Sequence, residues 1–339
     1  MMRFKTALRI AVFSAFWAAA AAPVAAYKVL VFWGIGGFAL GNAQLLNTAI
    51  REIGAAQGFE VDVISDRAIF TAANLAPYRA VVMNNNSELG KLLDTTHRAA
   101  LMAFLKTRGH VGIHLAAEVM GSWPAYREYL GTESASWSQG TVWLERDTLT
   151  PGIAAHPVLR GMPATFRLKD HWYAFKTNPR LSPGIQVLYT LKESNCTACI
   201  TMPGGDHPVS WVRESAEGGR MFYMAQGHDA TAAADPATLR LLSNAILWAA
   251  RDSAFATGTL PGALSGRHGA KVAVARDGIR VEVSAPGTHA LEILRADGKR
   301  IFRREGNRLA AYDFPREPGI VFVNVLTTGG TMRRAVPGP

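Results

Sequence analysis

Cysteine is nearly absent from this chain. Only Cys196 and Cys199 occur, in the stretch "NCTAC". Ile200 follows where a haem-attachment motif would need a histidine. The pair can be interpreted as a local disulfide, as two free thiols or as a redox pair. A thioredoxin-like pair sits at a helix N-terminus in a βαβ unit, whereas a Gly/Pro-rich stretch follows here, so the local disulfide is favoured.

Long apolar runs and an excess of one charge are also missing from most of the chain. Only 18% of the residues are charged, and no segment after residue 26 is apolar for long enough to span a bilayer. Residues 27–259 hold 20 Lys/Arg against 19 Asp/Glu, so we expect no nucleic-acid partner. Residues 260–339 hold 13 against 7, and this basic module could contact an anionic envelope surface or simply be a solvated face.

The N-terminus has the pattern of a secretory signal. Residues 1–26 combine three basic residues, a short Ala-rich apolar run and the small-residue ending Val24-Ala25-Ala26. This pattern predicts a signal peptide that is cleaved before Tyr27 rather than a transmembrane anchor. We therefore expect a periplasmic or secreted protein.

The remaining chain predicts two domains. Apolar runs alternate with helical periodicity from residue 27, which indicates βαβ units and a parallel sheet covered on both faces. We expect further short strands at 141–146, 165–170 and 185–191, with His171 and His207 in loops. The domain is predicted to span 27–252, followed by a Gly-rich linker at 253–269. Residues 270–339 have short alternating runs between Gly-containing turns, which predicts a small antiparallel β-sandwich.

Several polar residues follow predicted strands, where open α/β sheets bind their ligands. They are Gly36, Gly37, Asn85, His114 and His228. The glycines belong to "GIGGFALG", which is no convincing G-x-G-x-x-G motif, and no acidic residue is clearly placed for a ribose. We therefore expect no nucleotide cofactor.

The stretch "HVGIHLAAE" (110–118) has the form of a nucleophile elbow, a strand followed by a tight turn of small residues. The elbow position holds His114 rather than Ser or Cys, and neither cysteine ends a strand of the parallel sheet. A Cys-dependent glutamine amidotransferase mechanism is therefore excluded. Imidazole is a good base or metal ligand, although His114 and His228 could also be structural.

In order and spacing, six motifs within 27–252 resemble the ThuA-like (trehalose utilisation) family. They are "KVLVFWGIGGF", "GHVGIHLAAE", "HPVLRGMP", "DHWYAF", "DHPVSWVRE" and "GRMFYMAQGH". The resemblance implies a flavodoxin-like, class I glutamine amidotransferase-like α/β fold with a histidine at the elbow. The chain departs from the family where "GFRH" is usual, because it has Gly37-Phe38-Ala39-Leu40. Glu118 stands near the position of a family aspartate.

The resemblance also implies a function in the catabolism of trehalose and related disaccharides, beside oxidoreductases that make 3-keto sugars. We expect acid/base chemistry on a small carbohydrate. His114 would be the base or, with His228, a ligand of a divalent ion such as Zn²⁺, and Asp170 or Glu118 would orient an imidazole. The candidate catalytic residues are thus His114, Glu118, Asp170 and His228. The candidate substrate contacts are Gly36, Gly37, Asn85, Trp172, Tyr173, Asp206, His207 and Trp211.

Two alternatives stay open at this point. The missing Arg-His pair and the basic C-terminal module favour a non-catalytic sugar-binding or envelope-associated protein. Hydrolysis by a carboxylate pair would need two acids from Glu118, Asp170 and Asp206 to converge on one bond.

Overall fold

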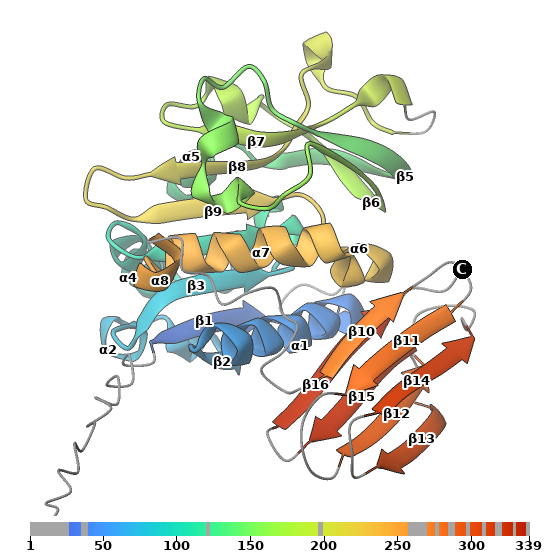
Figure 1. The fold of residues 1–339 in the computed structure, drawn as a ribbon. Coiled ribbons are helices and arrows are strands. Elements are labelled where there is room, and N and C mark those ends of the chain that lie inside the picture. The colour runs from blue at the N-terminus through green and yellow to red at the C-terminus, as the bar shows by residue number, and fades with distance from the viewer. Residues whose placement is uncertain are drawn as a thin grey trace, which may run out of the picture.

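The computed structural model of the chain (Figure 1) describes residues 27–34, 40–119, 123–195, 199–256, 270–274, 278–283, 289–295, 299–306, 310–315, 321–327 and 330–336. The expected signal peptide, Gly36, Gly37 and Cys196 lie outside these ranges. Cys199 is disulfide-bonded, which supports the disulfide interpretation, because Cys196 is the chain's other cysteine. No helix of the described part is long and apolar enough to cross a membrane.

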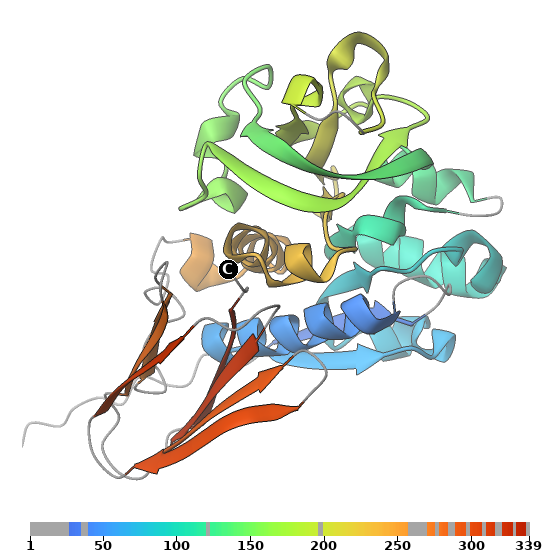
Figure 2. The ribbon, with the colours of Figure 1, turned by 90° about the vertical axis from the view of Figure 1, so that its right-hand side faces the viewer.

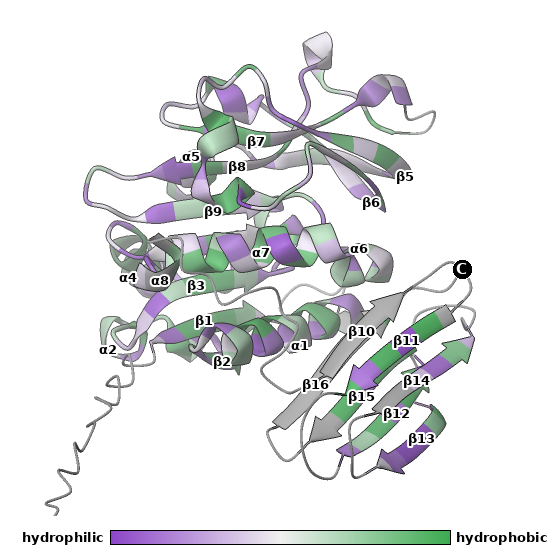
Figure 3. Cartoon of the chain, viewed as in Figure 1, coloured by the Kyte–Doolittle hydropathy of each residue, from purple (hydrophilic) through white to green (hydrophobic). Residues whose placement is uncertain are grey.

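Five parallel strands form one half of a nine-stranded sheet, in the order β2-β1-β3-β4-β9. Helices α1 and α7 lie on one face of this half and α4 on the other, as Figures 1 and 2 show together. The central strands are hydrophobic along their length (Figure 3) because both of their faces are buried. The elements are β1 (Lys28–Trp33), α1 (Leu40–Gln57), β2 (Glu60–Ile64), α2 (Ala72–Leu75), β3 (Tyr78–Asn84), α3 (Leu89–Leu92), α4 (Thr95–Leu105), β4 (Gly109–Ile113), α5 (Pro124–Leu130), β9 (Arg220–Met224), α6 (Ala230–Ala234), α7 (Pro236–Ala249) and α8 (Ser253–Ala256).

Four antiparallel strands extend this sheet in the order β9-β8-β7-β5-β6. They are β5 (Ser134–Arg146), β6 (Thr165–Phe175), β7 (Gln186–Leu191) and β8 (Pro208–Glu214). The prediction of a loop around His171 is wrong, because β6 continues through "DHWYAF" to Phe175. The first half of β6 alternates between exposed and buried residues, whereas its last residues are buried on both faces, so the alternation that marks a strand is lost.

The C-terminal residues form two antiparallel sheets, drawn in orange and red in Figure 1, in the orders β10-β11-β14 and β13-β12-β15-β16. Valine, isoleucine and leucine side chains from both sheets form their core. The predicted α/β fold with a parallel sheet and a small antiparallel C-terminal module is thus confirmed. The strands are β10 (Ala270–Val274), β11 (Gly278–Val283), β12 (His289–Arg295), β13 (Arg300–Gly306), β14 (Ala310–Pro315), β15 (Val321–Thr327) and β16 (Gly330–Val336).

The two cores share no residue. The α/β core extends to Phe255, three residues beyond the predicted boundary at 252, and the second core begins at Ile279. The Phe255 ring is buried, and its carbonyl accepts a hydrogen bond from Arg160 Nη1 at 2.7 Å. The α/β domain therefore needs α8 to complete its packing.

We predict that a fragment of residues 27–256 unfolds cooperatively at the temperature of the α/β transition in the 27–339 chain, because its core is complete. A matched fragment of residues 27–252 should be less stable by about 3–5 kcal/mol, the usual cost of removing a buried phenylalanine. Thermal and urea denaturation followed by circular dichroism measure both. A 27–256 fragment that does not fold, or that matches the shorter one in stability, would contradict the prediction.

Candidate functional site

The carboxyl ends of three neighbouring parallel strands bring several candidate residues together. Asn84 of β3, Ile113 of β4 and Met224 of β9 lie side by side in the register of the sheet. The segments that follow these strands therefore share one edge, which is where open α/β sheets bind ligands. These segments carry Asn85, His114 and His228.

His114 directly follows β4 as the first residue of the 3₁₀ turn η2 (His114–Ala117), in a left-handed conformation with φ of 47°. A non-glycine residue rarely adopts this conformation, which costs of order 1–3 kcal/mol and is typical of functional turns. Three hydrogen bonds hold the residue there. Tyr223 Oη donates to the His114 carbonyl at 2.9 Å, the ring Nδ1 lies 2.5 Å from the Ala225 carbonyl oxygen, and Nε2 lies 3.1 Å from Tyr173 Oη.

These partners define the protonation of the ring. Because a carbonyl oxygen only accepts, Nδ1 carries the proton and donates it to Ala225, which leaves Nε2 to accept from the Tyr173 hydroxyl. Burial lowers the pKa of the His114 imidazole to about 3 and raises that of the Tyr173 hydroxyl well above its ordinary value. His114 and Tyr173 are therefore a neutral base and a neutral acid in direct contact.

Four aromatic rings, which we call the ring row, connect His114 to the surface. The ring centroids are 5.0 Å apart for His114 and His228, 4.0 Å for His228 and His171, and 4.7 Å for His171 and Trp137. The last two pairs are stacked, with interplanar angles of 16° and 2°. His114 is 1% exposed and Trp137 is 58% exposed, so the row runs from the buried turn to solvent.

Asp170 of β6 fixes the loop that carries His228. Its fully buried carboxylate accepts hydrogen bonds from the backbone N–H groups of Gly227 at 2.6 Å, His228 at 3.2 Å and Asp229 at 2.8 Å, and from that of His171 at 2.8 Å. Asp170 therefore orients the backbone of the 227–229 loop. It does not take an imidazole N–H, as the sequence had led us to expect, because both of its oxygens already accept from amides.

This loop admits only glycine at one position. Gly227 has φ of 123°, and a Cβ atom there would lie 2.7 Å from Ile113 Cγ2. Burial raises the pKa of the Asp170 carboxyl from 3.8 to about 7, although the backbone donors oppose the shift. Ionising this buried carboxyl thus costs desolvation free energy, and the 227–229 loop depends on the hydrogen bonds that the carboxylate accepts.

Glu118 lies at the end of η2 and is half-buried. Burial and the neighbouring Glu88 raise the pKa of its carboxyl. Its charge in turn contributes to the raised pKa of Tyr173 and of Tyr223. Glu118 therefore acts electrostatically on the two tyrosines that hold His114. It does not orient the His114 ring, since Ala225 holds Nδ1.

Buried side-chain amides follow β3 and β9, the strands on either side of β4. Asn85, with φ of 54°, donates from Nδ2 to the Gly227 carbonyl at 3.1 Å. The side chains of Asn86 and Gln226 are fully buried, and all four of their amide atoms lack a hydrogen-bond partner in the part of the chain that is described. Buried polar atoms without protein partners commonly bind water or a ligand. Sequence reasoning placed Asn85 and Asn86 together at this strand end and selected Asn85 as the substrate contact, but it missed Gln226.

Two predicted stacking residues belong to the core instead. Trp172 and Trp211 are fully buried, and their Nε1 atoms donate to the carbonyls of Gly140 and Leu130, both at 2.9 Å. Neither indole presents a face to a ligand, so an expectation of pyranose stacking does not fit their surroundings. The aromatic residue that is exposed beside the histidines is Trp137, which the sequence analysis did not select.

Asp206 and His207 contact protein groups rather than open space. Asp206 Oδ2 accepts from Arg180 Nε at 2.8 Å. His207 is fully buried, with Nδ1 2.9 Å from Glu193 Oε1 and Nε2 2.8 Å from the Tyr173 carbonyl oxygen. His207 thus fixes the backbone of β6 at Tyr173 and supports the site indirectly.

The expected zinc site is not formed by the side chains as they lie. Within the described ranges, no group of three or more His, Cys, Asp or Glu side chains is placed to hold a metal ion. His114 Nε2 is occupied by Tyr173 Oη, and the stacked rings of His171 and His228 do not converge on one point. Metal ligation requires lone pairs that meet about 2 Å from one ion.

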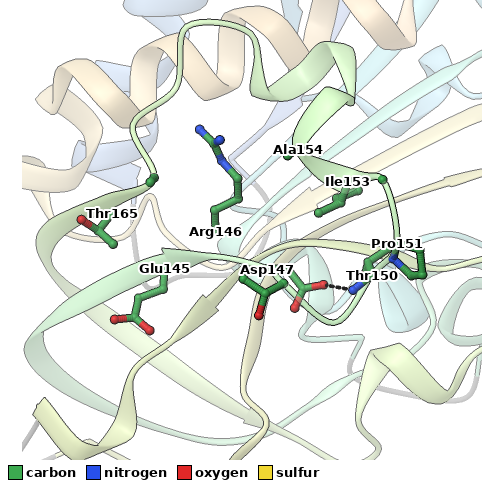
Figure 4. Close-up of a pocket in the computed structure, with 11 residues that line it drawn as sticks. Glu145, Arg146, Asp147, Thr150, Pro151, Ile153, Ala154 and Thr165 are labelled. Carbon is green, nitrogen blue, oxygen red and sulfur yellow. Dashed lines mark hydrogen bonds between the residues drawn. The ribbon is translucent and has the colours of Figure 1, made fainter.

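A cavity of about 540 Å³ lies at the C-terminal end of β5 (Figure 4). Arg146, which lines it, is nine residues along the strand from Trp137. Three charged residues, Glu145, Arg146 and Asp147, line it. Each already binds a protein group: Glu145 binds Lys192, Arg146 the Met162 carbonyl and Asp147 Arg180. The strand-end histidines are therefore the stronger candidate site.

We predict that the 27–339 chain, purified without chelator, carries well below one equivalent of divalent metal by mass spectrometry, because its imidazoles do not converge. His114→Ala and His228→Ala should leave this value unchanged. One equivalent of zinc in the wild type, lost in both variants, would contradict the prediction and show that the rings turn to bind an ion.

Asp170→Asn should alter the pH dependence of stability. Because the folded-state pKa of about 7 exceeds the ordinary 3.8, the folded protein binds this proton more tightly than the unfolded chain does. The stabilisation is complete below about pH 4 and is lost as the pH rises through 7. Urea unfolding should therefore show that wild-type stability falls more between pH 5 and pH 8 than that of the variant. An equal pH dependence in both proteins would contradict this assignment.

Known proteins resemble the chain in both sequence pattern and fold. The family model for ThuA, described as trehalose utilisation, matches residues 28–249. No curated protein matches the chain significantly. A ThuA-like protein from Bacteroides uniformis is 23% identical with a TM-score of 0.57, over 68% of this chain and 94% of that one. A second, from Parabacteroides merdae, is 19% identical with a TM-score of 0.52, over 66% and 90%.

These solved structures are below 25% identity and support the fold. The family model covers more than half of the 339 residues, and it includes the elbow histidine, Asp170 and the 227–229 loop. The resemblance inferred from the six motifs is confirmed: the chain belongs to the ThuA (trehalose utilisation) family.

Proposed function

We propose that this protein is an exported carbohydrate-processing enzyme that acts on a disaccharide or its 3-keto derivative by acid/base chemistry. The observation that carries the proposal is the direct contact between two neutral groups, His114 Nε2 and Tyr173 Oη, at 3.1 Å. Membership of the trehalose utilisation family supports the substrate class. The signal-like N-terminus supports export.

The chemistry follows from the acidity of a 3-keto sugar. A ketone at C3 acidifies the hydrogen on C2, which a fixed neutral base can remove. When the sugar binds, the Tyr173 hydroxyl turns from His114 Nε2 to the glycosidic oxygen, which frees the Nε2 lone pair. Nε2 then takes the C2 proton to give the C2–C3 enolate, and the enolate's electron pair forms the C1–C2 double bond as the glycosidic C1–O bond breaks. The Tyr173 hydroxyl protonates the departing oxygen. The imidazolium then returns its proton to the Tyr173 oxygen, so the pair regains its starting state.

The surroundings suit this exchange. His114 stays uncharged at neutral pH because burial lowers its pKa to about 3, and the imidazolium forms only beside the enolate that it creates. Preorganised groups in a dry site stabilise such charge without reorganisation. The unpartnered amides of Asn86 and Gln226 supply donors and acceptors that the ketone and hydroxyl groups of a sugar can use.

We predict that His114→Ala and Tyr173→Phe each lower kcat/KM for 3-keto-trehalose by about 10²–10⁴-fold, the usual contribution of general acid/base catalysis. The double variant should lose little more than either single one, because the two groups act as a unit. Release of glucose measures turnover. His156→Asn is the matched control, since His156 lies outside the site and asparagine keeps its capping role.

Unchanged turnover in His114→Ala would overturn the proposed mechanism. A wild-type protein that binds the sugars and transforms none of them would favour the alternative, a non-catalytic sugar-binding protein on an enzyme fold. Calorimetric binding to the same ligands separates that result from a loss of folding.

A further inference from the structure

Strand β5 exposes a tryptophan beside the histidines of the site. Trp137 is 58% exposed, and His171 covers one face of its ring. A single exposed apolar residue usually has no functional meaning. Trp137 differs because it is the outer end of the ring row, which connects it through His171 and His228 to His114.

Two rings, those of His228 and His171, separate Trp137 from His114 in the ring row. Its three steps from Trp137 to His114 measure 4.7, 4.0 and 5.0 Å between ring centroids. Two rings thus stand between His114 and the indole, so we infer that a one-ring sugar at His114 falls short of Trp137 and that the second ring of a disaccharide reaches it. The exposed Gln139 lies on the same face of β5, opposite His171 in the register, where its amide can bind hydroxyl groups.

The charge near the row suits an uncharged ligand. Lys169 of β6 and Asp229 of the 227–229 loop form an ion pair, with 3.6 Å between Lys169 Nζ and Asp229 Oδ2. An indole face carries negative potential and attracts the weakly positive C–H groups of an apolar sugar face. A pyranose offers such a face together with a rim of hydroxyl groups.

We propose that Trp137 forms a distal subsite, on which the second ring of a neutral disaccharide stacks while the first ring reaches His114. This inference rests on the proposed function and deepens it, because it makes Trp137 the residue that selects two-ring over one-ring substrates. The indole positions the substrate and takes no part in proton transfer.

The test compares two ligands and three variants of the 27–339 chain by isothermal titration calorimetry. The ligands are 3-keto-trehalose, with two rings, and methyl 3-keto-α-glucoside, with one. Trp137→Ala should weaken binding of the disaccharide about tenfold and leave the one-ring ligand unchanged. Trp137→Phe should retain most of the affinity. Trp143→Ala is the matched control, because Trp143 is 40% exposed on the same face of β5.

Either of two results would overturn the subsite: an equal loss for both ligands in Trp137→Ala, or an equally large loss in Trp143→Ala. Melting temperatures of the variants identify any loss of folding. A wild-type protein that binds both ligands without turning them over, with the predicted loss in Trp137→Ala, refutes the proposed catalysis and supports the subsite. A wild type that binds neither ligand overturns both.

Discussion

The buried carboxylate of Asp170 joins the two halves of the sheet at the point where the site is built. It belongs to β6, the last strand of the sheet and four strands away from β9, yet it accepts hydrogen bonds from the loop that follows β9. The antiparallel half must therefore curl back over the carboxyl ends of the parallel strands, as Figure 2 shows for β5 and β6. This contact fixes β6 to the loop that carries His228, beside the Tyr173–His114 hydrogen bond and the stacking of His171 on His228.

The other features of the site follow from this curl. Once β6 lies against the strand ends, Tyr173 reaches His114 Nε2 and His171 stacks on His228. The pairing of β6 with β5 then brings Trp137 onto His171. His207 supports the same strand from behind through the Tyr173 carbonyl. Strand β6 thus supplies Tyr173 as the acid, His171 as one ring of the ring row, and Asp170, which holds the 227–229 loop.

Sequence reasoning anticipated what depends on local pattern. The hydrophobic runs of the parallel strands and the elbow at His114 are properties of neighbouring residues, and each lies where it was predicted. The partners of His114 are not local, because Tyr173 lies 59 residues away and Ala225 lies 111 away. No periodicity encodes the curl that brings them together, so Tyr173 was identified as a stacking surface rather than as an acid.

The sequence also does not distinguish buried aromatic residues from exposed ones. Trp172 and Trp137 are equally hydrophobic in sequence, and only their places in the pleat of β5 and β6 make one a core residue and the other a surface residue. The loss of alternation near the end of β6 hid the strand itself, and with it the side to which each ring points. Burial decides such cases, and burial is a property of the whole fold.

The electrostatic character of the site follows from these contacts and agrees with a neutral ligand. The carboxylate of Asp170 accepts its hydrogen bonds from backbone amides, and Lys169 pairs with Asp229. Burial raises the pKa of the Glu118 carboxyl, which favours its neutral form. Burial lowers the pKa of the His114 imidazole and so keeps it uncharged. The groups left to meet a ligand are an imidazole, a phenol, buried amides and an indole. Such a site offers hydrogen bonds and an apolar face, which is the chemistry of a sugar, and Lys169, the cation at its rim, is already paired with Asp229.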